Sequence, residues 1–209
     1  MSYIKYPRTH HLYFSHPSSD DKVMKDYSYL QDEDIIVTEK LDGENTTLYS
    51  DYAHARSLEV LIGEDRSWVK AIHAQIARDI PIGWRVCGEN VYAKHSISYE
   101  NLDSYFYVFS IWTDKNECLS WDDTLDWCKL LNLKSVPELY RGKFDLVILQ
   151  NLAKELDSSI CEGFVVRPLK QFSFSDFNKL VCKWVRENHV QSNRHWRSQL
   201  IVPNGLKER

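Results

Sequence analysis

Cysteine pairs that could hold a metal ion or a disulfide framework are missing from this sequence. The five cysteines are an odd number and include no Cys-x-x-Cys pair, so neither a zinc site nor structural disulfides are indicated. Long apolar runs are also missing. No stretch approaches the roughly 20 residues that a membrane-spanning helix needs, and the N-terminus has no apolar signal core. These absences predict a cytoplasmic protein that does not enter a membrane.

Glycine-rich phosphate loops are absent as well, because the chain contains neither Gly-x-Gly-x-x-Gly nor a Gly-Lys-Ser/Thr ending. A general excess of positive charge is also absent. The formal net charge of −4 argues against broad, non-specific binding of nucleic acid. The exception is the end of the chain, residues 179–209, where seven Lys and Arg residues face only two glutamates. Such a basic end suits local contacts to phosphates, and a solvated or frayed C-terminus is the alternative.

The composition indicates one folded unit. The 209 residues are 43% apolar and 13% aromatic, and a chain of this size can bury one sizeable core. There is no internal repeat and no low-complexity stretch. We therefore expect a single domain over residues 1–209, with residues 187–209 as a basic tail that packs on it or contacts a ligand.

Helical and strand patterns alternate along the chain. Apolar residues at helical spacing predict three helices, with Ser67 and Ser120 as N-caps of the first two. The helices are expected over residues 67–78, 120–131 and 145–156. Runs rich in Val, Phe, Tyr and Trp predict buried strands, over residues 84–88, 105–112, 162–167 and 180–185. This pattern predicts an α+β fold with mixed, largely antiparallel sheets flanked by helices.

A single lysine lies between carboxylates in residues 38–45 (TEKLDGEN). Residues 35–37 are typical of a buried strand and residues 46–49 of a returning strand, so Lys40 would lie at the mouth of a hairpin, with Gly43 in the turn. A free lysine has a pKa of ~10.4, and its amine attacks phosphorus only after losing a proton. Nearby groups must therefore lower that pKa. A surface lysine after a strand is the alternative for these residues alone.

Further segments complete an ordered set that begins with residues 40–43 (KLDG). In chain order they are residues 54–57 (HARS), 87–90 (CGEN), 107–112 (YVFSIW), 162–167 (EGFVVR) and 180–186 (LVCKWVR). The set resembles the motifs of the covalent nucleotidyltransferases, the superfamily of polynucleotide ligases and capping enzymes. Within that superfamily, residues 35–186 are most similar to the ATP-dependent RNA ligases of the small phage and bacterial type.

This resemblance implies a ligase adenylation domain that uses ATP and Mg²⁺, with Mn²⁺ as a second candidate, to join RNA ends that carry a 5′-phosphate and a 3′-hydroxyl. Lys40 would be the nucleophile that forms a lysyl-AMP intermediate. Glu39 would help to read adenine and Phe109 would stack on its ring. Glu89 would contact the ribose, and Arg56 would lie near the ribose and the incoming phosphate end.

The charges that the reaction needs can be argued from its chemistry. Adenylyl transfer builds negative charge on the α-phosphate and on pyrophosphate, so cations must face those oxygens and carboxylates must hold magnesium through its waters. Glu162 would orient a metal-bound water and Asp42 would assist. Lys183 would lie against the α-phosphate and help to lower the pKa of Lys40. Each side chain alone could be an ordinary charge at a strand end, but their joint occurrence favours catalysis.

One position departs from the pattern of many RNA ligases, whose last motif has two lysines separated by one residue. Val181 and Val185 flank Lys183 at that spacing, so only one of the two lysines is present. Lys179, expected on the same strand face, or Arg186, expected on the opposite face, would have to substitute. The contacts to pyrophosphate are the ones affected.

Alternative functions share parts of this pattern. A DNA end-sealing ligase or a GTP-using capping enzyme usually carries an oligonucleotide-binding barrel after the last motif, and the short segment after Arg186 predicts no such C-terminal barrel here. A non-catalytic RNA-end binder would not need the full set of Lys40, Glu89, Glu162 and Lys183. The physiological RNA is left open between nicked duplexes, broken tRNA loops and single strands, as is a separate RNA-binding partner protein.

Two pairs of histidines carry weaker signals. His10 and His11 suggest no third metal ligand, so a solvated N-terminal segment is favoured over a metal site. His189 and His195 would either contact RNA or anchor the tail against the core.

Overall fold

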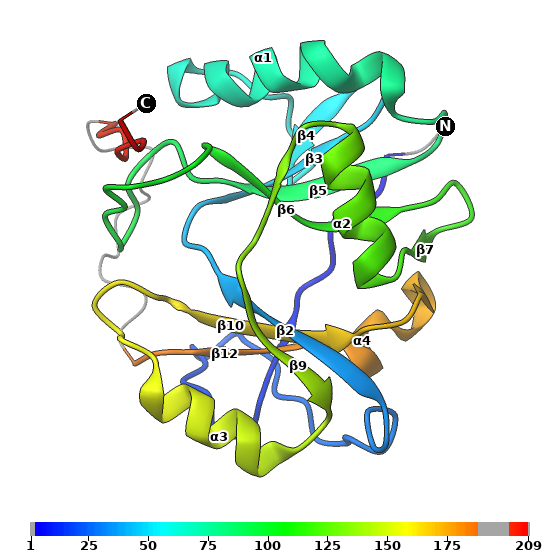
Figure 1. Ribbon diagram of the computed structural model, residues 1–209, viewed down its shortest axis with the longest axis vertical. Coiled ribbons are helices and arrows are strands. Elements are labelled where there is room, and N and C mark those ends of the chain that lie inside the picture. The colour runs from blue at the N-terminus through cyan, green and yellow to red at the C-terminus, as the bar shows by residue number, and fades with distance from the viewer. Residues whose placement is uncertain (1–2, 188–200, 209) are drawn as a thin grey trace.

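Two β-sheets face each other across the molecule (Figure 1). The computed structural model describes residues 3–187 and 201–208, and the strands in these ranges all belong to one sheet or the other. The first, here called the β2 sheet, has the order β1 (His10–His11), β12 (Cys182–Val185), β10 (Gly163–Pro168), β2 (Asp34–Lys40) and β9 (Glu138–Lys143). The second, the β5 sheet, has the order β11 (Phe172–Ser173), β7 (Glu117–Cys118), β6 (Phe106–Trp112), β5 (Arg85–Asn90), β3 (Glu44–Leu48) and β4 (Ala53–Ala55), with β8 (Lys134–Ser135) beside β6.

Neighbouring strands are antiparallel except for two pairs. β1 runs parallel to β12, and β8 runs parallel to β6. The predicted α+β fold with mixed, largely antiparallel sheets is therefore confirmed. One predicted strand begins later than expected, because residues 177–180 form the short helix α4 (Phe177–Leu180) and the strand β12 starts at Cys182.

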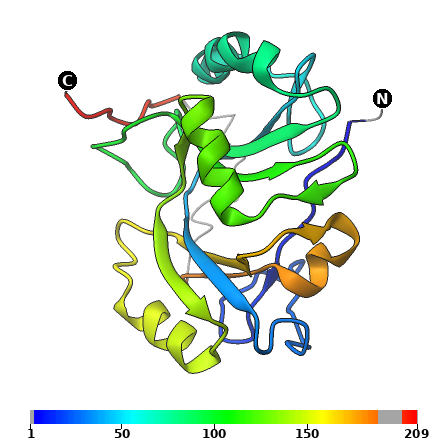
Figure 2. The same ribbon diagram turned by 45° about the vertical axis from the view of Figure 1, so that its right-hand side comes forward.

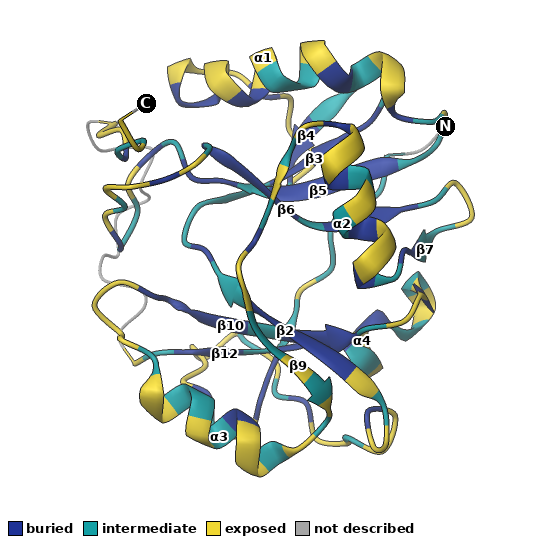
Figure 3. Cartoon of the chain, in the orientation of Figure 1, coloured by how far each residue is buried: buried dark blue, intermediate teal, exposed yellow. Residues whose placement is uncertain are grey.

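Helices cover the outer faces of both sheets, and their exposed residues lie on the sides turned away from the strands (Figure 3). On the β5 sheet, Val69 and Cys128 share a core cluster with Val86, and on the β2 sheet Leu149 packs against Phe164 and its neighbours. These helices are α1 (Ser67–Ile76), α2 (Trp121–Leu130) and α3 (Leu146–Glu155), with 3₁₀ turns at Glu64–Arg66, Ala77–Asp79 and Phe174–Asp176. In the ranges that the structure describes, no helix is long and apolar enough to cross a membrane.

The two predicted N-caps have different outcomes. Ser120 caps α2, since its hydroxyl accepts a hydrogen bond of 3.1 Å from the backbone N–H of Asp123. The prediction for Ser67 is wrong. Ser67 is the first residue of α1, and the N-cap is Arg66, which makes no capping bond with its side chain. The chain enters α1 from a 3₁₀ turn, so it needs no such cap to begin the helix.

The predicted hairpin around Lys40 is also wrong. β2 pairs with β10 and β9, whereas β3 pairs with β4 and β5 in the other sheet. The chain therefore crosses between the sheets at residues 41–43. Gly43 passes close to β5 at the crossing, where an added Cβ would lie 3.0 Å from both the Asn90 carbonyl carbon and Val91 Cγ1. The glycine is needed for contact with the protein's own backbone, a reason that the local sequence does not reveal.

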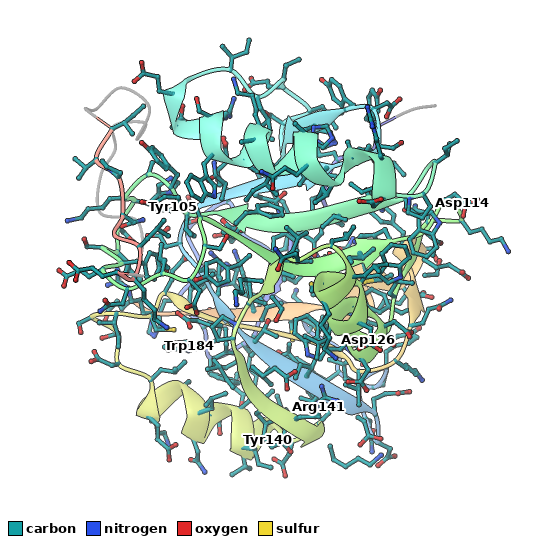
Figure 4. All side chains as sticks on the ribbon, turned by 45° about the horizontal axis from the view of Figure 1, so that its top comes forward. Tyr105, Asp114, Asp126, Tyr140, Arg141 and Trp184 are labelled. Carbon is teal, nitrogen blue, oxygen red and sulfur yellow. The ribbon has the colours of Figure 1, made fainter. Side chains whose placement is uncertain are left out.

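Apolar clusters join the two sheets on either side of an open centre. One contains Ile36 and Leu41 with Trp121, and the other contains Cys87 and Trp112 with residues of α4 and Val165 of β10. Arg141 of β9 lies below α2 (Figure 4), and its guanidinium pairs with Asp122 at 2.6 Å. The sheets are thus held at a fixed separation around a space that the clusters do not fill.

Residues 201–208 pack on the loop formed by residues 91–105. Asn204 is buried and bonds this loop with its side chain: Nδ2 donates to the Val91 carbonyl at 2.8 Å and Oδ1 accepts from the Tyr99 N–H at 2.9 Å. The Tyr105 hydroxyl donates to the Asn204 carbonyl at 2.7 Å, on the side of the molecule where Figure 4 labels Tyr105. This segment therefore fixes a loop that lies far from it in the sequence. The predicted RNA or anchoring contacts of His189 and His195 lie outside the described residues.

Asn204→Ala is expected to lower the free energy of unfolding by about 2–4 kcal/mol, because it leaves two buried backbone groups without partners, at about 1–3 kcal/mol each. Urea unfolding followed by circular dichroism measures the change. Asn151→Ala, on the exposed surface of α3, is the matched control and is expected to stay within about 0.5 kcal/mol of wild type. Equal effects of the two substitutions would show that the side-chain bonds of Asn204 contribute nothing to stability.

Candidate active site

A cavity of about 840 Å³ lies between the two sheets. Strands of both sheets supply its walls, so residues from distant parts of the sequence meet there. Six of the eight predicted site residues line it: Glu39, Lys40, Arg56, Glu89, Phe109 and Lys183. The other two, Asp42 and Glu162, are not among the residues that line the cavity, but both interact electrostatically with Lys40.

Lys40 is the last residue of β2 and enters the cavity from one side. Gly163 of β10 lies opposite it in the sheet, and the preceding Glu162 accepts a hydrogen bond from Lys40 Nζ through Oε2. The Lys40 side chain is 25% exposed, whereas that of Glu162 is 7% exposed. The amine can therefore be reached from the cavity while its partner is shielded from water.

The pKa of Lys40 differs from the expectation. Burial disfavours the ammonium form, but the negative charges of Glu162, Glu89 and Asp42 outweigh burial and raise the pKa above its ordinary value. The predicted lowering is thus wrong for the protein by itself. The reason is that three carboxylates surround the amine, and their combined effect outweighs burial. The negative charge must be offset before the amine can lose its proton.

The raised pKa of Lys40 predicts a steep pH dependence. Below its pKa, the neutral fraction of an amine rises about tenfold per pH unit, so acylation of Lys40 by a small amine-reactive reagent should rise steeply up to and beyond pH 9. Glu162→Gln removes the largest favourable charge, lowers the pKa and should shift the profile toward lower pH. Peptide mass spectrometry at several pH values measures the modification of Lys40. Identical profiles for the two proteins would contradict the assigned effect of Glu162.

Asp42 is held by the protein backbone. Its Oδ2 accepts hydrogen bonds from the N–H of Ser96 at 2.7 Å, from the Ser96 hydroxyl at 2.6 Å and from the N–H of Ile97 at 3.0 Å. These residues belong to the loop that Asn204 fixes from its other side. The carboxylate therefore anchors the loop beside Lys40, and its second oxygen, Oδ1, lies 3.9 Å from His95 Nδ1.

Two more carboxylates face the cavity from opposite sheets. Burial raises the pKa of Glu89 to about 8, despite the opposing effect of Lys40. The raised pKa makes the protonated form of Glu89 more accessible than that of a free carboxyl, and in this form Glu89 can donate a hydrogen bond as well as accept one. Burial also raises the pKa of Glu39. Because burial disfavours their negative charge, both groups are better suited to hydrogen-bond a neutral nucleoside than to lie beside a phosphate.

Two further cations, Lys183 and Arg56, line the cavity from opposite sheets. Lys183 of β12 lies opposite Val165 in the sheet, and burial together with the charge of Lys40 lowers its pKa. Arg56, just after β4, donates from Nε to the Tyr6 carbonyl at 3.5 Å. Lys179 does not share a strand face with Lys183 as expected, because it lies in α4 and pairs with Asp176 at 3.0 Å.

Arg186 points toward the loop formed by residues 91–105, which Asp42 anchors. Its backbone N–H donates to the Glu162 carbonyl at 3.0 Å, and Nη2 donates to the Ser96 hydroxyl at 3.4 Å. It therefore occupies the Lys40 end of the site, beside Glu162.

The N-terminal segment, residues 3–9, is a part of the site that the sequence did not indicate. It runs from the β5 sheet to the β2 sheet (Figure 2) and lines the cavity through residues 5–9. The Tyr6 ring contacts Phe109 edge-on at 5.1 Å between centroids. The segment continues into β1, where His11 is fully buried and its Nδ1 lies 2.8 Å from the Ser15 hydroxyl oxygen. The prediction of a solvated segment at His10 and His11 is therefore wrong.

The residues fit a magnesium ion that is held jointly with nucleotide phosphates. Among the residues that the structure describes, no group of three His, Cys, Asp or Glu side chains could hold a metal without other ligands. Magnesium commonly uses only one or two carboxylates and completes its shell with phosphate oxygens and waters. Glu162 and Asp42, whose charges both act on Lys40, are the side chains that would hold it.

Comparison with known proteins agrees with this geometry. The model of the RNA ligase family matches residues 33–185. The chain belongs to the RNA ligase family. No curated protein matches the chain.

Solved structures share the fold at low sequence identity. A protein from Aquifex aeolicus assigned as an ATP-dependent DNA ligase has a TM-score of 0.60 and 18% identity, over 86% of this chain and 49% of its own. An archaeal ATP-dependent RNA ligase has a TM-score of 0.58 and 15% identity, over 86% and 48%. A Naegleria gruberi RNA ligase mutant with ATP and Mn has a TM-score of 0.56 and 19% identity, over 90% and 62%. The chain thus spans about half the length of the first two.

Proposed function

We propose that this RNA ligase family member is an ATP-dependent RNA ligase that adenylylates itself on Lys40 and then seals RNA ends. The observation that supports the proposal most strongly is the placement of one amine. Lys40 Nζ reaches a nucleotide-sized cavity and is paired with Glu162, and a second lysine, Lys183, lines the same cavity. A half-buried lysine that is surrounded by carboxylates beside such a space suits covalent nucleotidyl transfer.

In the first step, the neutral Lys40 amine attacks the α-phosphorus of ATP. A P–N bond forms, the bond to pyrophosphate breaks, and pyrophosphate leaves with the bonding electrons. Glu162 Oε2 already accepts a hydrogen bond from Nζ, so it is placed to take the proton that the amine loses. Phe109 offers a ring face to adenine, while Lys183 and Arg56 offset the charge that grows on the phosphates. Bound magnesium would neutralise the phosphates further and thereby promote loss of the amine proton.

In the later steps, AMP moves from Lys40 to the 5′-phosphate of an RNA strand, and the Lys40 amine regains its proton. A 3′-hydroxyl then attacks the 5′-phosphate and displaces AMP, which closes the phosphodiester. Each step is a phosphoryl transfer at the same cavity, so one set of cations serves all three. The five buried cysteines are free, as a reducing cytoplasm would keep them, and we place the activity there.

Incubation of the full chain with α-labelled ATP and magnesium, with manganese in a parallel reaction, tests the proposal on a denaturing gel. A chase with 5′-phosphorylated RNA nicks, DNA nicks and single strands then identifies the polymer. We expect a covalent AMP adduct that is discharged by RNA ends. Discharge by DNA alone would favour the second candidate, a DNA end-sealer such as the assigned activity of the Aquifex aeolicus neighbour. RNA retention without any adduct would instead indicate a non-catalytic binder.

A further inference from the structure

The N-terminal segment brings an additional arginine to the cavity. Arg8 lines the cavity together with Arg56 and Lys183. Its position follows from strand pairing: β1 runs parallel to β12 with His11 opposite Lys183, and the Leu12 N–H donates to the Lys183 carbonyl at 2.7 Å. Arg8 precedes His11 by three residues, so the same pairing that fixes Lys183 also sets the height of Arg8 along the cavity wall.

The N-terminal end of the segment, at residues 4–6, holds Arg56 in place. The Tyr6 carbonyl accepts from Arg56 Nε, and the Ile4 N–H donates to the Tyr49 hydroxyl at 3.0 Å. The N-terminal segment thus bridges both sheets. It holds Arg56 of the β5 sheet and Lys183 of the β2 sheet beside Arg8. No motif assigned above includes Arg8, which lies outside the residues that the family matches.

These three cations are short of negative partners. Across residues 3–187 and 201–208, none of them forms an ion pair with a carboxylate within 4.0 Å, and Arg8 bonds only the Asp20 carbonyl, from Nη1 at 3.4 Å. Carboxylates act on them only from beyond that distance: Asp21 and Glu89 on Arg56, and Asp21 and Glu162 on Lys183. Asp21 itself accepts from the Ser18 hydroxyl at 2.7 Å and lies 3.3 Å from His11 Nε2.

The mutual effect of the cations agrees with this shortage. Burial is the main cause of the lowered pKa of Arg56 and Arg8 adds to it, while Arg56 is among the causes of the lowered pKa of Lys183. Positive groups that destabilise one another around a polar cavity are relieved by an anion, and phosphate accepts hydrogen bonds from several guanidinium and ammonium groups at once.

We infer that Arg8, Arg56 and Lys183 form a phosphate subsite in which Arg8 supplies the cation that the last motif lacks. The subsite takes a phosphate group of at least two negative charges. This inference rests on the proposed function for the source of that phosphate, which is either the pyrophosphate half of ATP or the 5′-terminal phosphate of RNA. In both cases Arg8 contacts a phosphate of a substrate. No bond forms or breaks beyond those of the proposed reaction.

Arg8→Ala tests the inference, with Arg8→Lys as the conservative variant and Arg78→Ala as the matched control. Arg8 is exposed and its one side-chain bond is long, so its loss should leave the thermal unfolding temperature nearly unchanged. Arg78 lies exposed in a 3₁₀ turn outside the cavity. Calorimetry at low salt measures binding of inorganic tripolyphosphate. A parallel titration compares otherwise identical RNA oligonucleotides with a 5′-phosphate and a 5′-hydroxyl.

We expect Arg8→Ala to weaken one of these anions about tenfold, with partial recovery in Arg8→Lys and no change in Arg78→Ala. Weaker tripolyphosphate with a raised KM for ATP in adduct formation assigns the subsite to pyrophosphate. Loss of the preference for 5′-phosphorylated RNA, with slower discharge of the adduct, assigns it to the RNA end. Unchanged binding of both anions, or a wild-type protein that binds neither, would overturn the inference. Because binding needs no turnover, a wild-type protein without any adduct would refute the proposed function and leave this test intact.

Discussion

Lys40→Arg is expected to form no covalent AMP adduct, a loss of at least about 10³-fold in the rate of self-adenylylation. Arginine keeps a positive charge beside Glu162, so the buried carboxylate stays paired and the fold is preserved. The guanidinium, however, cannot lose its proton at any ordinary pH. The variant therefore separates the charge of Lys40, which it retains, from the nucleophile, which it removes.

Intact-protein mass spectrometry after incubation with ATP and magnesium measures the adduct, and peptide mapping identifies the residue that carries it. Lys129→Arg is the matched control, because Lys129 is exposed on α2 and pairs with Asp126 of the same helix. The control should be adenylylated like wild type. An adduct at wild-type level on Lys40→Arg, or one mapped to another lysine, would remove Lys40 from the role of nucleophile.

The same variant distinguishes a catalyst from an RNA binder. RNA that already carries AMP on its 5′-phosphate needs no lysine nucleophile for the closing step, so Lys40→Arg should still seal such RNA. Arg56 and Lys183, which remain in the cavity, would supply the cations for that step. A protein that only binds RNA ends would seal neither substrate. Sealing of adenylylated RNA without adduct formation is thus a pattern that the proposed mechanism predicts.

The sequence identified the chemistry of the site better than its geometry. Lys40, Glu89 and Lys183 lie in short motifs whose residue types follow from the reaction, and the structure brings all three to one cavity. Their arrangement depends on pairings between distant segments, such as Lys40 with Glu162, which are 122 residues apart. Local pattern suggested a hairpin instead, because nothing near Gly43 reveals that the chain changes sheets there.

The N-terminal segment could not be predicted for a related reason. β1 has only two residues, too few for a strand pattern to be visible, and the contacts of Tyr6 and Arg8 depend on sheets formed later in the chain. The direction of the Lys40 pKa shift was missed because it is the sum of opposing effects. Burial lowers it and three carboxylates raise it, and a sequence does not give the distances that decide between them.

Gly163→Ala is expected to lower the free energy of unfolding by about 3 kcal/mol or more, through overlap and backbone strain of about 1–3 kcal/mol each. Gly163 has a φ of 157° and lies between Lys40 on β2 and Val185 on β12. An added Cβ would overlap the Trp184 carbonyl oxygen and lie 2.9 Å from Val185 Cα. These are backbone atoms of a central strand pair, so no side-chain rotation can relieve the contact.

Thermal unfolding measures this effect, and at about 2–4 °C per kcal/mol for a chain of this size the midpoint should fall by about 6–12 °C. Gly142→Ala is the matched control. Gly142 lies in β9, and the atom nearest to its added Cβ is the hydroxyl of the Tyr140 side chain, which can move aside. A Gly163→Ala midpoint as high as that of Gly142→Ala would mean that β10 and β12 tolerate a wider spacing than the structure shows.

Gly163→Ala should also slow adenylylation at temperatures where the variant is still folded. β10 lies between the strands that carry Lys40 and Lys183, and Glu162, the partner of Lys40, immediately precedes Gly163. The Glu162 carbonyl is bonded to the Arg186 N–H at 3.0 Å, so pushing β12 away also displaces the Glu162 backbone. A misplacement of about 1 Å can cost about 10²-fold in rate. Loss of rate in the folded variant would show that this glycine sets the geometry of the nucleophile as well as the stability of the sheet.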